Sequence, residues 1–427
     1  MALFVNVLLA SVVTCSLWVD VAAQGAEVKS VDNAEQFALL CRIYNVAKNP
    51  PINHVDLQDP NRIVDEIDAI NASFSEKKQF NETEQVGNSS DAQVKRTTSR
   101  EETVSQALLS RIKKKAHTIL KEIRKLNETR NIEKVKSEFA EVIYGEEMNE
   151  SDLCNGALKG VGDRGAACGR PGEMMKGTHS GKNMVVDFFC LCAMRTEAGG
   201  KDKEGVQDIC GVYLGSKNGN HGWNTKCPET SSTMWASVKK GCGSLTHQSA
   251  KPRAEGHEVI EDFLKHLKSG GLYRWADVKS RGNNVVGSGR KEGMMGTGAG
   301  TEGGKEDILC NGSRGYGRSI NPPGGVCVYY GPESEWDNID WLKKFRTALS
   351  STHTLNNQTS TIQRDIEKLQ TLLHRAEEIY ETAKVITEVQ HPVVPTNLQT
   401  AAKRLTAYNA AWIHPTNTHF ILLFVLL

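Results

Sequence analysis

The sequence lacks the short motifs by which many enzymes and metal proteins are recognised. Neither His-Glu-x-x-His nor Gly-x-Ser-x-Gly occurs, and no cysteine stands near a histidine in a family signature. No Cys-x-x-Cys pair occurs either, and the closest cysteines are Cys190 and Cys192, which argues against a zinc site. Isolated histidines such as His221, His257 and His374 are typical of surface or packing positions. We therefore expect no catalytic residue, no metal and no cofactor.

Two glycine patterns resemble nucleotide-binding loops but lack the context that such loops need. Gly298-Ala299-Gly300-Thr301-Glu302-Gly303 has the spacing of a dinucleotide-binding turn, which functions only between a strand and a helix. Neither element is evident in the flanking sequence. Gly303-Gly304-Lys305 is followed by Glu306, where a phosphate-binding loop needs Ser or Thr. We interpret both patterns as chance matches in a glycine-rich region.

The chain has no excess of charge of either sign, because 52 Lys and Arg face 51 Asp and Glu. This balance gives no electrostatic reason to expect a nucleic-acid partner. One local basic cluster lies between the apolar positions of a predicted helix, and we interpret it as a solvated helix face. It consists of Arg111, Lys113, Lys114, Lys115, Lys121, Arg124 and Lys125.

Two apolar runs lie at the ends of the sequence. Leu3–Trp18 followed by Val21-Ala22-Ala23 predicts a secretory signal peptide, residues 1–23, cleaved after Ala23. The alternative is a short buried helix. Phe420–Leu427 is apolar but shorter than the roughly 20 residues that span a bilayer.

The C-terminal run has the context of a glycosylphosphatidylinositol (GPI) attachment signal. The small residues Asn409-Ala410-Ala411 and the polar spacer Trp412–His419 precede it. We expect anchor attachment at Asn409 and removal of residues 410–427, and the alternative is an ordinary C-terminal core segment.

Glycine is nearly absent outside one region, since 35 of the 38 glycines lie between Gly156 and Gly331. The same region is rich in cysteine, and such a segment depends on cross-links rather than on helix propensity. Cys15 is lost with the signal peptide, and an even ten cysteines remain, from which we predict five disulfides. They are Cys41, Cys154, Cys168, Cys190, Cys192, Cys210, Cys227, Cys242, Cys310 and Cys327.

Seven N-glycosylation sequons are consistent with a secreted chain. We expect a glycoprotein. The sequons begin at Asn71, Asn81, Asn88, Asn127, Asn149, Asn311 and Asn357.

Two segments far apart in the sequence carry heptad patterns, about Ser99–Tyr144 and Thr361–Gln390. Apolar residues at alternating spacings of three and four lie on one helix face and are buried against another helix. We predict a mainly α fold, an elongated antiparallel helical coiled-coil bundle into which an irregular, disulfide-rich lobe, residues 154–331, is inserted. The first pattern is Leu109, Ile112, Ala116, Ile119, Ile123 and Leu126, resuming after a slip at Ile132, Val135, Phe139 and Val142. The second is Ile362, Ile366, Leu369, Leu373, Ala376, Tyr380 and Ala383.

Shorter elements are predicted between and before these segments. A helix containing Phe37, Leu40, Cys41 and Tyr44 should begin at a capping box of Asp32 and Glu35 and end at Asn49-Pro50-Pro51. Another helix is indicated by Ile63, Ile67 and Ile70. The run Met184–Cys192 fits a buried strand or a helix, and Glu258–Leu267 predicts a short helix. Ser334 with Asp337 predicts a helix start, and Asn356-Asn357 a polar break.

These features together resemble the variant surface glycoproteins of African trypanosomes. The most specific are the helix Glu35-Gln36-Phe37-Ala38-Leu39-Leu40-Cys41 and the anchor signal. The short stalk, residues 391–409, without a cysteine-rich C-terminal domain, is similar to the congolense type, with a B-type N-terminal domain over residues 24–390.

The resemblance implies a surface coat glycoprotein, GPI-anchored on the outer face of the plasma membrane, that shields the parasite and evades host antibodies by antigenic variation. It implies no enzyme activity, and we expect self-association as a dimer or trimer and no nucleic-acid partner. An alternative of the same architecture is a GPI-anchored nutrient receptor of the transferrin or haptoglobin–haemoglobin type, which should expose an apolar or aromatic patch. A third alternative, a secreted enzyme, would need convergent titratable groups.

Overall fold

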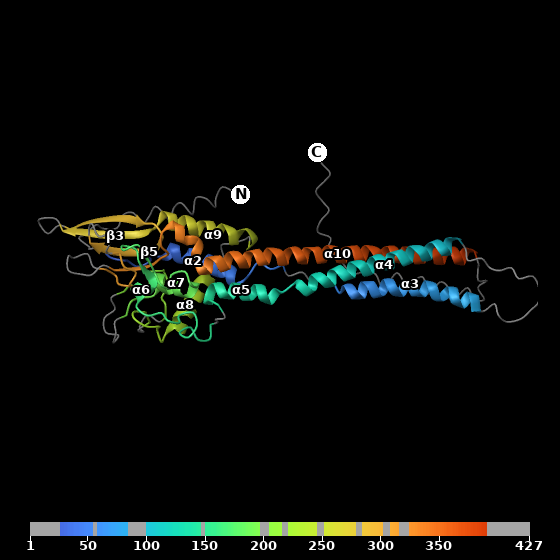
Figure 1. Ribbon diagram of the computed structural model, residues 1–427, viewed down its shortest axis with the longest axis horizontal. Coiled ribbons are helices and arrows are strands. Elements are labelled where there is room, and N and C mark those ends of the chain that lie inside the picture. The colour runs from blue at the N-terminus through green and yellow to red at the C-terminus, as the bar shows by residue number, and fades with distance from the viewer. Residues whose placement is uncertain are drawn as a thin grey trace, which may run out of the picture. The chain divides into compact units, whose positions relative to one another are not determined.

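The computed structural model describes residues 26–53, 58–83, 100–146, 150–196, 205–215, 221–245, 252–278, 284–301, 308–315 and 324–390 (Figure 1). The predicted signal peptide, stalk and anchor signal lie outside these residues. The chain forms two compact units, the first from the described parts of residues 1–55 and 128–360, and the second from those of 56–127 and 361–427. Helix α10 (Asp340–Gln390) contributes to both.

Unit 2 is built from three helices, α3 (Pro60–Thr83), α4 (Arg100–Thr129) and the part of α10 from residue 361 onward. The Asp68 carboxylate lies 2.9 Å from His117, and Arg124 donates to Asn61 at 2.6 Å, so α3 and α4 run antiparallel. Their shared core consists of Ile63, Val64, Ile67, Leu109, Ile112, Ala116, Leu120, Ile123, Ile362, Ile366, Leu369, Leu372 and Ala376.

The second heptad pattern is buried unevenly, which leads to a prediction for unit 2. Leu369 is fully buried, whereas Leu373 is only partly buried at the edge of the core. Leu369→Ala should therefore lower the free energy of unfolding by about 2–5 kcal/mol, through lost burial and a cavity. Leu373→Ala, the matched control, should cost less. Chemical denaturation of both variants tests this, and equal losses would contradict the burial seen here.

Unit 1 contains the remaining helices around one large core. Helix α5 (Ile132–Tyr144) is separated from α4 by a break at which the Asn131 side chain accepts a bond from the Lys134 amide at 2.8 Å. The break coincides with the slip in the heptad pattern. Phe139 packs edge-on against Phe345 of α10, with ring centroids 5.9 Å apart, and Lys344 donates to Glu141 at 2.9 Å.

The glycine-rich region is more ordered than predicted, and the expectation of a mostly irregular lobe is wrong. It holds a four-stranded sheet in the order β4-β3-β5-β6, in which β3 and β5 are parallel and the other neighbours antiparallel. The strands are β3 (Gly271–Val278), β4 (Asn284–Lys291), β5 (Met294–Thr301) and β6 (Gly324–Tyr329). A two-stranded sheet pairs β1 (Gly169–Arg170) with β2 (Met175–Lys176).

Helices pack against the sheet and against one another. Helix α7 (Met184–Cys192) packs against β6 and against α2 (Ala34–Lys48), and α9 (Pro252–Ser269) contacts α2 and β5. The run Met184–Cys192, which fitted either a strand or a helix, is a helix. Asn183 caps its N-terminus by accepting a hydrogen bond from the Val186 amide at 3.0 Å. The remaining helices are α6 (Arg164–Cys168) and α8 (Ser231–Ser244).

Three predicted helix boundaries are wrong. Asp32 does not cap α2, because its carboxylate binds Arg274 and the Lys29 amide instead. Ser334 lies inside a short 3-10 helix, η2 (Glu333–Asn338), which precedes α10. No break occurs at Asn356-Asn357, since α10 continues through it and buried Asn356 donates to the Pro51 carbonyl and accepts from the Asn53 amide.

None of the helices in the described ranges is both long enough and apolar enough to cross a membrane.

Candidate functional site

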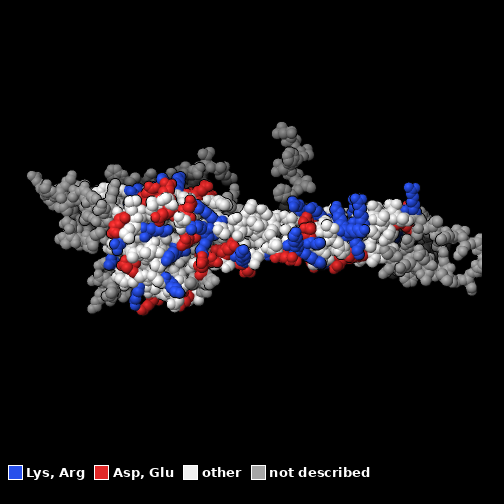
Figure 2. Space-filling model, in the orientation of Figure 1, with Lys and Arg blue, Asp and Glu red and all other residues white. Residues whose placement is uncertain are grey.

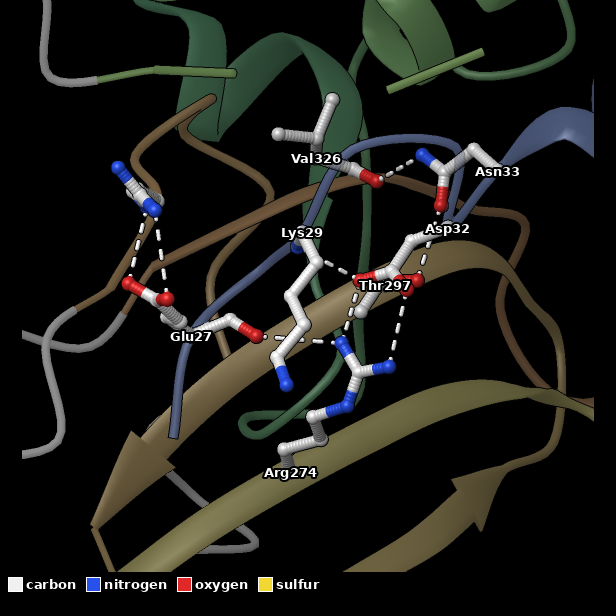
Figure 3. Close-up of polar contacts among 8 residues, drawn as sticks. Glu27, Lys29, Asp32, Asn33, Arg274, Thr297 and Val326 are labelled. Atoms are coloured by element: carbon white, nitrogen blue, oxygen red, sulfur yellow. Dashed lines mark hydrogen bonds and ion pairs between the residues drawn. The ribbon is translucent and has the colours of Figure 1, made fainter. Parts of the chain in front are cut away.

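A polar site of unit 1 surrounds the segment that precedes α2 (Figure 3). Ala26 and Val28 are buried, and the Val28 amide donates to the Arg314 carbonyl at 2.8 Å. Arg274 of β3 binds both carboxylate oxygens of Asp32 and the carbonyl of Glu27. Arg314 pairs with the Glu27 carboxylate at 2.9 Å. The first ion pair joins the N-terminal segment to strand β3, and the second joins it to the segment of residues 308–315.

Asn33 is the buried centre of this site. Its amide nitrogen donates to the carbonyls of Leu191 and Val326, each at 2.8 Å, and its oxygen accepts from the Thr297 hydroxyl at 2.9 Å. One side chain thereby joins the start of α2 to the end of α7 and to strands β5 and β6. The sequence did not reveal this role, because an asparagine before a helix normally indicates a cap, and Asn33 makes no side-chain cap bond.

Charged side chains are also buried near the two ends of α7. Asp187, in its first turn, accepts hydrogen bonds from Trp341 at 2.7 Å, from Tyr330 at 2.8 Å and from the Gly181 amide at 2.9 Å. Arg164 donates to the Cys190 carbonyl at 3.0 Å near the other end. An anion near the helix N-terminus and a cation near its C-terminus are both favoured by the helix dipole. These three groups all donate hydrogen bonds to the Asp187 carboxylate and hold it in place. We therefore assign Asp187 a structural role.

Asp187→Asn is expected to change how stability depends on pH. Burial raises the pKa of the Asp187 carboxyl from 3.8 to about 6. Between these values the folded protein keeps a proton that the unfolded chain has released, so this carboxyl lowers stability as the pH rises from about 4 to about 6. The wild type should lose roughly 3 kcal/mol relative to the variant between about pH 4 and pH 7.

Urea unfolding of both proteins at several pH values measures this difference. Asp152→Asn is the control, because Asp152 lies at the surface and its pKa is lowered by bonds from Asn155. A difference between the wild type and Asp187→Asn that stays constant with pH would contradict the prediction.

An open cleft of about 400 Å³ lies beside the N-terminal segment. Its charged lining residues already have partners, since Asp208 accepts from Ser30 at 2.8 Å and Arg314 pairs with Glu27. Both charged lining side chains are thus held by other side chains of the described residues. It is lined by Ser30, Met194, Gly205, Val206, Gln207, Asp208, Tyr213 and Arg314.

The glycine motifs lie only partly in the described residues, because residues 302–307, which include Gly303-Gly304-Lys305, are outside them. Gly298, Ala299 and Gly300 belong to strand β5 rather than to a strand–helix turn. His374 is exposed on α10 beside Glu377 and Glu378. Across the described ranges, no group of three or more His, Cys, Asp or Glu side chains is arranged to hold a metal ion.

All ten cysteines of the predicted set lie in described residues and form five disulfides. Cys41 and its partner Cys242 are both fully buried. The pairs are Cys41–Cys242, Cys154–Cys227, Cys168–Cys190, Cys192–Cys210 and Cys310–Cys327.

The sequons fall into different surroundings. Asn127 and Asn357 are exposed on helices, whereas Asn71 and Asn311 are partly buried. Asn88, Asn149 and the predicted anchor residue Asn409 lie outside the described residues, as does the side chain of Asn81.

One protein family matches this chain. The family model described as the trypanosomal VSG domain matches residues 16–107 and 82–371, which together cover most of the sequence. No curated protein matches the chain.

Proposed function

The chain belongs to the trypanosomal VSG domain family of surface coat glycoproteins, and from this premise we propose that it is GPI-anchored and serves antigenic variation. The family match over residues 16–371 is the observation that carries the proposal. In this role the chain shields the parasite surface from host antibodies on the extracellular face of the plasma membrane. It acts without catalysis.

The proposed architecture follows the sequence prediction in outline. Residues 1–23 are the signal peptide, 24–390 the ectodomain, 391–409 the stalk and 410–427 the removed anchor signal. The helices form an antiparallel coiled-coil bundle through which copies self-associate as a dimer or trimer. The three-helix core of unit 2 supports the bundle, and the five disulfides of unit 1 support exposure to an oxidising exterior.

An exposed patch of aromatic side chains would favour the receptor alternative, and the tryptophans of residues 154–331 do not supply one. Trp223 and Trp235 are buried, with 1% and 0% of their surface exposed, and Trp275 stacks on Tyr273 with ring centroids 5.6 Å apart. These three tryptophans therefore form no exposed aromatic patch for a ligand. Copy number separates the two functions, because a coat protein is abundant on the surface and a receptor is not.

The anchor prediction is tested on the mature C-terminus. Phosphatidylinositol-specific phospholipase C should release the protein from the cell surface, and mass spectrometry should find a last peptide that ends at Asn409 with the anchor remnant. A bulky residue in place of Ala411 should block processing, whereas Ala411→Ser should be tolerated. A surface-derived peptide containing Phe420–Leu427 would refute the anchor.

A further inference from the structure

The basic residues of α4 divide into two groups that differ in their surroundings. Lys113, His117 and Arg124 face α3, where the first two contact Asp68 and the third contacts Asn61. The other group has no carboxylate partner among the described residues. We call it the basic stripe, and it consists of Arg111, Lys114, Lys115, Lys121 and Lys125.

The basic stripe lies on the side of α4 opposite its core. At 100° per residue its five side chains fall within a sector of about 120°, facing away from the buried Ile112, Ala116 and Ile123. It extends over roughly 21 Å of helix. All five side chains are exposed, and Glu122 is the one acidic residue in the same sector. Figure 2 shows Lys and Arg side chains gathered in the region where Figure 1 draws α4 and α10.

Charge is arranged differently on the other long helices. On α10, Lys368 pairs with Asp365 and Lys384 with Glu381, and on α5, Lys136 pairs with Glu133. The basic stripe instead places like charges four residues apart, Arg111 with Lys115 and Lys121 with Lys125, a spacing that weakens a helix. An external anion would remove this repulsion. In a chain of net charge +1, the basic stripe is therefore a local concentration of positive charge.

We propose that the basic stripe binds a linear sulfated polysaccharide. Four of its five residues are lysines, whose point charges on flexible stems suit a repeated anion better than bidentate recognition of one group. The stripe is straight and one-sided, which fits a chain lying along the helix. The proposal rests on the proposed function in one respect, the extracellular location, where sulfated polysaccharides are the polyanions to be met.

A membrane surface fits the basic stripe less well. Helices that lie in a membrane interface present an exposed apolar face, and between Arg111 and Lys125 the apolar side chains Ile112, Leu120 and Ile123 are buried in the core of unit 2. Anionic lipids are concentrated in the cytoplasmic leaflet, opposite to the proposed location.

Chromatography and binding on immobilised heparin, with the full-length purified protein, test the proposal. The wild type should be retained at low salt and elute as salt screens the contacts. Lys114→Glu/Lys121→Glu should weaken binding on the order of tenfold or more, because each substitution replaces a charge that attracts the sulfate groups with one that repels them. Lys159→Glu/Lys240→Glu, two exposed lysines of unit 1, makes the same change in net charge and should bind like the wild type.

Several results would overturn the proposal. These are a wild type that is not retained, equal losses in the two double variants, or stripe-dependent binding to phosphatidylserine vesicles without stripe-dependent binding to heparin. Circular dichroism of each variant checks the fold, which these exposed substitutions should leave unchanged. Phospholipase C release and coat abundance do not depend on the basic stripe, so failure of this proposal is distinguishable from failure of the proposed function.

Discussion

Asn33→Ala is expected to destabilise unit 1 by roughly 3 kcal/mol or more. The substitution removes the partner of three groups, the carbonyls of Leu191 and Val326 and the hydroxyl of Thr297. Asn33 is fully buried, so water does not replace the lost bonds, and each unpaired buried group costs about 1–3 kcal/mol. This loss is a large fraction of the stability of an ordinary domain.

Urea unfolding followed by circular dichroism measures the effect. Asn33→Asp keeps the shape of the side chain but turns the donor toward Leu191 and Val326 into an acceptor, and it should be as damaging as alanine. Asn155→Ala is the control, because Asn155 is exposed and its side chain donates to the neighbouring Asp152. Should Asn33→Asp retain wild-type stability, the side-chain bonds would not be what holds the N-terminal segment.

The long helices could be predicted because their signal is local and repeated. A spacing of three and four residues requires a helix whatever it packs against, and the interruption near Asn131 appears in the sequence as a slip of the pattern. Helix α2 was identified in the same way, from four apolar residues on one face. The two predicted helix starts failed for different reasons. Asp32 binds Arg274, a residue that no local pattern contains, and Ser334 lies in a 3-10 helix that precedes α10.

The sheet of unit 1 could not be predicted because β5 pairs with β3 and with β6, which are far from it in the sequence, and only β3 and β4 form a local hairpin. Strand β5 reads Met-Met-Gly-Thr-Gly-Ala-Gly-Thr, a composition with low strand propensity, and it becomes a strand by pairing with β3 and β6. Gly287 of β4 shows the same dependence, since a Cβ there would lie 2.4 Å from the ring of Trp275. An aromatic side chain on one strand thus requires glycine on the next.

The contacts of residues whose partners lie far away in the sequence could not be predicted either. Arg274 meets Asp32 across 242 positions, and Asn33 meets Val326 across 293. Disulfide pairing also depends on contacts between distant residues. Ten cysteines predict five disulfides, but the sequence does not say which cysteines pair. Local patterns therefore predicted the helices, and the polar site of unit 1 became visible only in three dimensions.

Removal of the Cys41–Cys242 disulfide is expected to have an effect of similar size. It joins α2 to α8 across 201 positions, the longest separation of the five. In the chain-entropy account, closing a loop of about 100 residues stabilises a protein by about 4.7 kcal/mol and longer loops add little more. Both cysteines are fully buried, so Cys41→Ala/Cys242→Ala also leaves a cavity. The double variant should lose about 5 kcal/mol.

The Cys154–Cys227 disulfide is the matched comparison. It closes a shorter separation of 73 positions, and both of its cysteines are partly exposed. Cys154→Ala/Cys227→Ala should therefore be the less damaging double variant in urea unfolding. In the wild type, this bond should also be reduced before Cys41–Cys242 when dithiothreitol is added to the native protein, because a thiolate must reach the sulfur that it attacks. Mass spectrometry after trapping the free thiols gives the order, and early reduction of Cys41–Cys242 would show that α2 and α8 separate more easily than their packing implies.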